Sequence, residues 1–389
     1  MNRWIVLVSV CGSAFFGGAV WEALFAGRTP LAAQSASPLP APPRSTSSVN
    51  DRPPMSMDPA PVDLFERVIQ QVSPAVVAVD AVKPAPATGA RAGKPTEESG
   101  SGAMVRFAGY RGTFVITNNH VVSGARAEQI YVTLADGRIM IPDRMWADAE
   151  SDVALLHLAA ENLPTITFGD SERVRVGQWV LAFGSPFGLN QTVTHGIISA
   201  RERGQISLGN TIRIKEFLQT DAAINPGSSG GPLVDITGAL VGVNTAIASN
   251  NGNNSGVSFS IPVNLVARVT RQLLEKGSVT RGYLGLQLAP SLDPATALRH
   301  GYDRVSGALV ESVHPDGPAA AAGLRPADII AKLDSVDIRD ENQLINIVSS
   351  LPAGQRVKLT IWRAKRWQDL EAIVGNWVAP VATIAGTNR

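Results

Sequence analysis

Apolar runs of different lengths divide this chain of 389 residues into segments with different expected structures. The first run extends from Trp4 to Trp21, holds no charged residue and follows Arg3. An uncharged run of about 18 residues can span a bilayer core, whereas the apolar region of a secretory signal usually has about 7–15 residues. Residues 1–26 are therefore predicted to be a membrane anchor with a cytoplasmic N-terminus, and a signal cleaved near 31–33 is the alternative.

The next segment, residues 27–61, is rich in proline, alanine and serine. Such a composition cannot bury enough apolar surface to fold, so the segment is predicted to be a tether. A flexible coil of this length reaches roughly 30–35 Å, which would hold a folded domain just off a membrane.

Beyond the tether the apolar pattern changes twice. Residues 62–71 have apolar side chains at helical spacing, and Pro74 ends that pattern. Short Val/Ile/Leu-rich runs then alternate with turn residues from Val76 to about Pro262, which predicts an antiparallel, mainly β domain. A second helical pattern, Val263–Lys276, closes this domain, with Gly277 as its C-terminal cap.

Charge and composition exclude several classes of function. The chain has 34 basic and 33 acidic residues, a net charge of +1 and no basic–aromatic block, so no nucleic-acid partner is expected. Cys11 is the single cysteine and histidines do not cluster, so neither a metal site nor a disulfide is predicted. No nucleotide-binding loop occurs, and no cofactor is expected.

Three polar residues beside strand-like runs have the types and the order of a catalytic triad. His120 follows Thr117-Asn118-Asn119, Asp152 precedes Val153-Ala154-Leu155-Leu156, and Ser229 lies within Gly227-Ser228-Ser229-Gly230-Gly231. In such a triad the serine attacks a carbonyl, the histidine transfers the proton, and the aspartate orients the imidazole. Taken singly, each motif also fits a purely structural role: a glycine-rich turn, a loop histidine, or a turn aspartate. The conjunction of all three favours catalysis, and the N–H groups of Gly227 and Ser229 are candidates for the oxyanion hole.

Six segments together resemble the HtrA family of serine proteases, which includes the bacterial Deg proteases. These segments are 116–122, 151–156, 183–200, 218–234, 242–247 and 257–262. The resemblance covers roughly 62–378 and implies two six-stranded antiparallel barrels of trypsin-like type with the triad in their cleft, then an α+β PDZ domain. Ser228 stands where the family commonly has Asn, and His195 stands where a small or polar residue is frequent. We interpret His195 as structural.

The resemblance also implies a division of the chain and a specificity pocket. The expected segments are the anchor or signal (1–26), the tether (27–61), the protease domain (62–278), the PDZ domain (279–378) and a short tail (379–389). Ile224, Ile247 and the backbone of Thr245, Ala246 and Ile247 would line the pocket and pair with substrate. Since none of these residues is acidic, a small aliphatic residue is expected before the scissile bond. The alternative is that the isoleucines only fill the core.

In the last domain, Tyr283-Leu284-Gly285-Leu286 resembles the carboxylate-binding loop of a PDZ domain. Such a loop captures the C-terminus of a peptide that adds a strand to the sheet. By resemblance, residues 83–98 and 201–215 correspond to regulatory loops, and Arg203 is the residue expected to sense the PDZ domain. Phe65 is the candidate contact in a homotrimer, and the alternative is that it packs on its own barrel.

Together these features predict a membrane-tethered, ATP-independent serine endopeptidase. Its expected substrates are unfolded or regulatory envelope proteins, membrane-associated ones included, and its expected place is the periplasmic side of a bacterial inner membrane. C-terminal peptides at the PDZ domain would regulate it. Two alternatives remain: a soluble periplasmic quality-control protease or chaperone released by signal cleavage, and a non-proteolytic PDZ scaffold.

Overall fold

The computed structural model describes residues 61–84, 95–185, 191–204, 214, 216–247 and 256–377, all within one compact unit. The expected anchor or signal (1–26) and all of the tether except its last residue lie outside these ranges. Within them, no helix combines the length and the apolar character that a bilayer crossing requires.

The first described helix, α2 (Pro61–Val72), confirms the helical pattern seen in the sequence. A proline suits its first turn because the missing N–H would have no helical partner there. Val68 and Val72 are buried on one face. A short 3-10 turn, Ser73–Ala75, contains Pro74 and leads directly into β1.

The first lobe of the following domain is one antiparallel sheet with the strand order β5-β4-β1-β2-β3-β7-β6. The sequence predicted a six-stranded barrel here, but the described strands form a seven-stranded sheet whose edges are β5 and β6. In the chain, Pro142 lies between β5 and β6. Because proline has no N–H, it cannot donate a hydrogen bond to a partner strand there. The strands are β1 (Val76–Lys83), β2 (Thr96–Val105), β3 (Thr113–Asn118), β4 (Ile130–Thr133), β5 (Ile139–Met140), β6 (Arg144–Asp148) and β7 (Val153–Leu158).

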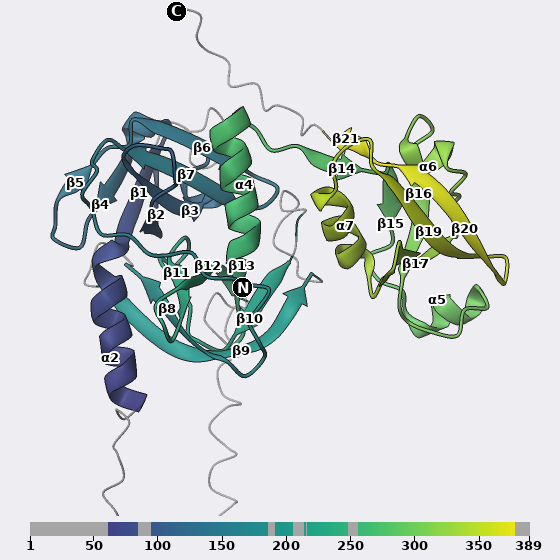
Figure 1. Ribbon diagram of the computed structural model, residues 1–389, viewed down its shortest axis with the longest axis horizontal. Coiled ribbons are helices and arrows are strands. Elements are labelled where there is room, and N and C mark those ends of the chain that lie inside the picture. The colour runs from purple at the N-terminus through teal and green to yellow at the C-terminus, as the bar shows by residue number, and fades with distance from the viewer. Residues whose placement is uncertain are drawn as a thin grey trace, which may run out of the picture. The chain divides into compact units, whose positions relative to one another are not determined.

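The second lobe is a closed barrel with the strand order β10-β13-β12-β11-β8-β9, as the resemblance implied. Its strands are β8 (Trp179–Gly184), β9 (Thr192–Arg203), β10 (Phe217–Thr220), β11 (Pro232–Asp235), β12 (Leu240–Ile247) and β13 (Ser258–Pro262). Helix α4 (Val263–Lys276) follows, and Gly277 ends it in a left-handed conformation with φ 73°. Figure 1 shows α4 beside the strands of this domain.

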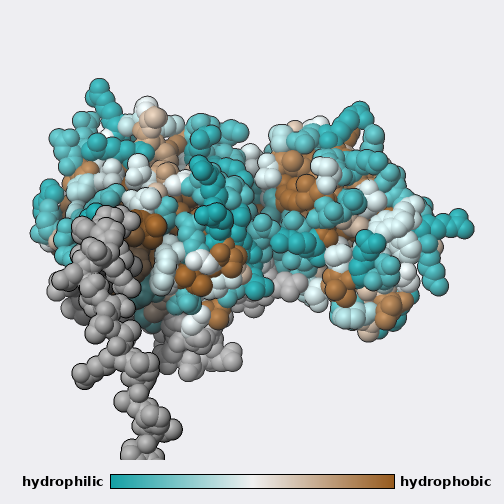
Figure 2. Space-filling view, turned by 60° about the horizontal axis from the view of Figure 1, so that its bottom comes forward, coloured by the Kyte–Doolittle hydropathy of each residue, from teal (hydrophilic) through white to brown (hydrophobic). Residues whose placement is uncertain are grey.

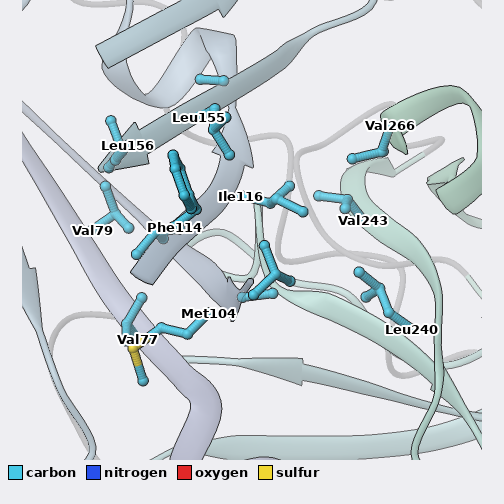
Figure 3. Packing of buried hydrophobic residues seen from close by; sticks show 14 of the residues in the cluster. Val77, Val79, Met104, Phe114, Ile116, Leu155, Leu156, Leu240, Val243 and Val266 are labelled. Carbon is cyan, nitrogen blue, oxygen red and sulfur yellow. The ribbon is translucent and has the colours of Figure 1, made fainter. Parts of the chain in front are cut away.

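One hydrophobic core joins the two lobes. Ile116 of β3, Val243 of β12 and Val266 of α4 belong to the same buried cluster. Figure 3 shows Ile116 of the first sheet close to Val243 of β12, within the same buried cluster. Since loops at the junction of the two lobes carry the candidate catalytic residues, this shared core fixes the frame of the site.

The C-terminal part has its own core and two sheets. The larger sheet has the path β15-β16-β17-β19-β20 with β18 beside β17, and the smaller pairs β14 with β21. Its strands are β14 (Arg281–Tyr283), β15 (Leu286–Leu288), β16 (Ala308–Val313), β17 (Ile329–Leu333), β18 (Val336–Asp337), β19 (Arg356–Arg363), β20 (Arg366–Ile373) and β21 (Gly375–Trp377). Its helices are α5 (Pro294–Arg299), α6 (Pro318–Ala321) and α7 (Glu341–Ser350).

Candidate active site and peptide groove

His120 lies in α3 (Asn119–Val122), a single helical turn directly after β3. Its Nδ1 is 2.8 Å from Oδ2 of Asp152, and its backbone N–H donates to Oδ1 of the same carboxylate at 2.9 Å. The Asp152 side chain is buried, whereas the imidazole is partly exposed. With Nδ1 engaged, Nε2 is the ring nitrogen left for proton transfer.

The backbone of Asp152 is held in an unusual conformation. Its φ is 57°, which non-glycine residues seldom adopt. Its carbonyl accepts hydrogen bonds from Asn118 Nδ2 at 3.0 Å and from the Asn119 N–H at 3.1 Å. Such a conformation costs about 1–3 kcal/mol, and the surrounding bonds maintain it. The two asparagines therefore position the carboxylate, a role that the sequence analysis did not identify.

Thr245 makes a second contact that the sequence analysis missed. Its hydroxyl donates to Oδ2 of Asp152 at 2.7 Å. The register between β12 and β13 shifts between Asn244 and Ala246, so Thr245 is the extra residue of a β-bulge. A bulge re-aims the side chain that it carries. Sequence reasoning placed Thr245 only on the substrate-binding edge, because bulges leave little trace in an apolar pattern.

Ser229 lies on the loop between β10 and β11 and shares this environment. Its hydroxyl donates to the Thr245 carbonyl over a long 3.4 Å, and its own carbonyl accepts from the Ser101 N–H at 2.7 Å. Both residues are described, and no hydrogen bond joins Ser229 Oγ to His120. Thr245 thus contacts Ser229 through its carbonyl and Asp152 through its side chain. The three predicted triad residues are brought together around it, and catalytic hydrogen bonds are commonly looser without substrate.

Two glycines shape the loop around Ser229. Gly227 and Gly230 have φ of 91° and 86°. A Cβ on Gly230 would lie 2.1 Å from the Ser101 carbonyl oxygen, so only glycine fits there. Within the described ranges, the N–H groups of Gly227 and Ser229 donate to no protein acceptor. They are therefore available to a substrate oxygen.

The predicted specificity residues have different environments. Ile224 is buried in the core of the second barrel beside Ala222 and Leu233, which matches the alternative that it fills the core. The backbones of Ala246 and Ile247 belong to β12, where they pair with Phe259 and Ser258. The side chains of these two residues lie outside the described part of the structure.

A groove of about 340 Å³ lies beside the predicted carboxylate-binding loop. Its lining includes Tyr283, Leu284, Gly285 and Leu286, apolar residues of β15 and α7, and polar residues such as Glu150 and Arg281. β15 is an edge strand, and in the described structure the N–H groups of Leu284 and Gly285 donate to no acceptor. An edge strand and free N–H groups are what an added peptide strand and its carboxylate require.

Buried charges connect this groove to the loop that carries Asp152. Arg281 of β14 forms ion pairs with Asp148 and, at 3.3 Å, with Glu150. Ser151 also donates to Asp148, and the Trp377 indole N–H donates to Glu150 at 2.8 Å. Glu150 is itself part of the groove lining. No sequence pattern indicated this cluster, because its bonded partners are far apart in the chain, by 227 residues for Glu150 and Trp377.

Arg203, the predicted sensor, is at the end of β9 and donates to Gln219 at 3.0 Å. Its neighbour Glu202 pairs instead with Arg339, which precedes α7. The part of the loop 201–215 between 205 and 213 lies outside the described residues. No group of three or more His, Cys, Asp or Glu in the described ranges is arranged to bind a metal ion.

Comparison with known domain families finds two that match this chain. Residues 100–243 match the trypsin-like peptidase domain, and residues 282–374 match the PDZ domain. A protein of Halomonas elongata described as a probable periplasmic serine endoprotease DegP-like is 41% identical over 278 residues, which are 72% of this chain and 56% of that protein. A protein of the same description from Chlamydia trachomatis is 43% identical over 264 residues, 68% of this chain and 51% of that protein. The chain spans about half the length of these curated relatives.

Solved structures match over more of their own length. The HtrA-type protease AlgW with a decapeptide is 37% identical with a TM-score of 0.65, covering 81% of this chain and 99% of that one. AlgW with a tripeptide is 38% identical with a TM-score of 0.67, covering 82% and 99%. The serine endoprotease from Yersinia pestis is 31% identical with a TM-score of 0.57, covering 81% and 98%.

Proposed function

Because this chain belongs to the HtrA-type family of serine proteases, we propose that it is an ATP-independent serine endopeptidase that uses His120, Asp152 and Ser229. One observation carries the proposal: the buried Asp152 carboxylate binds His120 Nδ1 at 2.8 Å while Thr245 contacts both Asp152 and Ser229. In this proposal the protease domain extends over residues 62–278 and carries the triad, and the PDZ domain extends over residues 279–378.

In this mechanism Ser229 Oγ attacks the scissile carbonyl as His120 removes its proton. His120 then protonates the leaving amine, which leaves an acyl group on Ser229. Water, deprotonated by His120, attacks this acyl group and releases it from Ser229. Asp152 stabilises the imidazolium that forms in each half. The N–H groups of Gly227 and Ser229 would bind the oxyanion, and one such donor typically contributes about 3–4 kcal/mol.

The proposed substrates are unfolded or regulatory proteins of the bacterial envelope, cleaved after small aliphatic residues. The absence of an acidic residue among Thr245, Ala246 and Ile247 supports this choice over Lys or Arg. The names of the curated relatives, which are described as periplasmic, support the compartment. Sequencing the N-terminus of the mature protein would separate an inner-membrane anchor from a cleaved signal. Cleavage-site mapping on unfolded proteins tests the specificity, and basic residues before most cut sites would refute it.

Peptide regulation rests on the groove at Tyr283–Leu286 and on the relatives solved with peptides. A peptide with a free apolar C-terminus would bind there and shift the protease toward its active conformation, with the loop 201–215 and Arg203 as the receiving region. The test uses a short reporter that cannot itself bind the PDZ domain. Faster reporter cleavage with saturating peptide supports regulation. An unchanged rate, with slower degradation of a C-terminally amidated protein substrate, would show that the PDZ domain only tethers substrates.

The experiment that tests the activity is cleavage of an unfolded protein such as casein, with and without a panel of C-terminal peptides. Ser229→Ala should abolish cleavage while folding and peptide binding persist, because the change removes the nucleophile and little volume. Ser228→Ala is the matched control, since it removes the adjacent hydroxyl. Equal turnover by the wild type and Ser229→Ala would exclude this mechanism.

A further inference from the structure

A cluster of aromatic rings lies in the PDZ domain outside the peptide groove. The ring centroid of Trp367 is 5.0 Å from that of Trp362 and 5.9 Å from that of Tyr302. Tyr302 is buried, and the Trp362 indole N–H donates to the His300 carbonyl at 3.0 Å. Trp362 and Trp367 also form a cross-strand pair near the turn of the β19–β20 hairpin. The hairpin turn is thereby fixed against the loop that follows α5.

Large apolar side chains at this end of the domain face solvent. Leu298 is 71% exposed, Val305 59% and Trp367 47%. Figure 2 shows brown apolar residues at the surface of the PDZ domain among hydrophilic ones. None of these three residues lines the groove between β15 and α7. These exposed apolar side chains are therefore separate from the peptide groove.

Basic side chains surround these apolar residues. The Arg304 guanidinium lies 5.9 Å from the Trp367 ring centroid, and the stem of Lys365 lies close to Gly301. Lys365 and Arg366 are exposed at the hairpin turn, and Arg299 is exposed at the end of α5. Three exposed carboxylates lie near this end, and each is paired: Asp303 with Arg304 at 3.2 Å, Asp337 with Lys332 and Asp369 with Lys358. Within the described ranges no carboxylate pairs with Arg299, Lys365 or Arg366, so the surface carries an excess of positive charge.

We propose that this surface, the basic–aromatic patch of Leu298, Arg304, Val305, Lys365, Arg366 and Trp367, binds an anionic lipid surface. Tryptophan suits the boundary between acyl chains and headgroups because its ring is apolar and its N–H is polar. Lysine and arginine can lay their stems along acyl chains and keep their charges among phosphates. The uncharged run Trp4–Trp21 independently indicates that the chain reaches a membrane. The contact would hold the PDZ domain at the bilayer.

Vesicle flotation of residues 58–389 tests the proposal without the N-terminal apolar run. This part is one compact unit, and the solved relatives that match 81–82% of the chain are folded over nearly their whole length. It should float with vesicles that contain phosphatidylglycerol, but not with phosphatidylcholine alone, and high salt should weaken binding. Because each basic residue near an anionic surface contributes about 1 kcal/mol, the double variant Lys365→Glu/Arg366→Glu should lose at least about tenfold in partitioning.

The matched control is Arg271→Glu/Lys276→Glu, which makes the same charge change at exposed positions of α4 in the protease domain. It should bind like the wild type. Leu298→Asn should also weaken binding, whereas Ile139→Asn, a similarly exposed position in the protease domain, should not. Brominated phosphatidylglycerol should quench the tryptophan emission less in Trp367→Phe than in the wild type.

Several results would overturn the proposal. Equal binding to neutral and anionic vesicles would remove its electrostatic basis, and equal losses in the hairpin variant and its control would remove its location. Binding of the patch to a soluble acidic protein without any binding to vesicles would identify a protein partner instead of lipid.

Discussion

At the scale of single residues, the site depends on how the Asp152 carboxylate is held. It accepts hydrogen bonds from the His120 N–H and the Thr245 hydroxyl, and its Oδ2 also contacts His120 Nδ1. The histidine comes from the first lobe and the threonine from the second, so the carboxylate is fixed by both. The orientation of the imidazole therefore depends on the packing of one lobe against the other.

Thr245→Val should lower kcat/KM about 10-fold or more, since a hydrogen bond to a charged group contributes about 1.5–3 kcal/mol. The shape of the side chain is nearly unchanged, so the fold should persist. The pH profile of kcat/KM should also move, because Asp152 would stabilise the imidazolium differently; a merely structural role would leave that profile in place.

The control for Thr245→Val is Thr113→Val. It removes another buried threonine hydrogen bond, from Thr113 to the Ala160 carbonyl at 2.7 Å, in β3 away from the site. It should reduce stability without altering the pH profile. If both variants had the same kinetics, Thr245 would have no specific part in positioning the triad.

The sequence indicated the candidate residues His120, Asp152 and Ser229, because each lies in a distinctive local motif, but it did not indicate the contacts that support them. The bond between Thr245 and Asp152 joins residues 93 positions apart and depends on a bulge, which leaves no periodic signal. The left-handed backbone of Asp152 was less visible, because an aspartate at a turn only permits that conformation and the bonds from Asn118 and Asn119 that hold it leave no periodic signal.

At the scale of elements, the residue just before β10, Glu216, is an ionisable group in an unfavourable environment. Burial raises the pKa of the Glu216 carboxyl, Arg268 at 3.8 Å opposes this shift, and Glu172 and Glu202 add to it. A carboxyl whose pKa is raised on folding destabilises the folded state above that pKa, and the cost disappears as the pH falls through it.

Glu216→Gln should therefore raise the Tm at pH 8 by up to about 3 °C, and the gain should shrink as the solution is acidified. Thermal unfolding of both proteins across pH measures it. Glu128→Gln makes the same change at an exposed site and should have no such pH dependence. A gain at pH 8 that persisted unchanged at acidic pH would contradict the account.

The elements themselves were largely predictable. α2 and α4 were recognisable from helical spacing and α4 also from its glycine cap. The open seven-stranded sheet was not predictable, because closure of a sheet into a barrel depends on pairing between its two edge strands, which are not marked by any local pattern. β5 has only two residues, too few for an alternating pattern to be visible.

At the scale of the whole molecule, the protein is expected to be a homotrimer held by its protease domains. Phe65 packs against Trp179 and His195 of its own chain, with centroid distances of 5.6 and 5.4 Å. Trp179 nevertheless remains 48% exposed, and Val176 nearby is also exposed. The remaining apolar surface is available to a second copy.

Light scattering of residues 62–389 should give a trimer, and removal of 280–389 should leave it intact. Trp179→Glu should weaken assembly, whereas Ile139→Glu, which places the same charge on another exposed apolar position, should not. A monomer for residues 62–389 would refute the proposed assembly.

The central claim is that Ser229 is the activated nucleophile of an endopeptidase. The most direct measurement is labelling of the folded protein with a fluorophosphonate in the presence of an activating C-terminal peptide, followed by mass spectrometry of the modified residue. We expect one label per chain on Ser229, none on Ser228, and loss of labelling in His120→Ala. A label elsewhere, or no label on a protein that still cleaves casein, would contradict the claim.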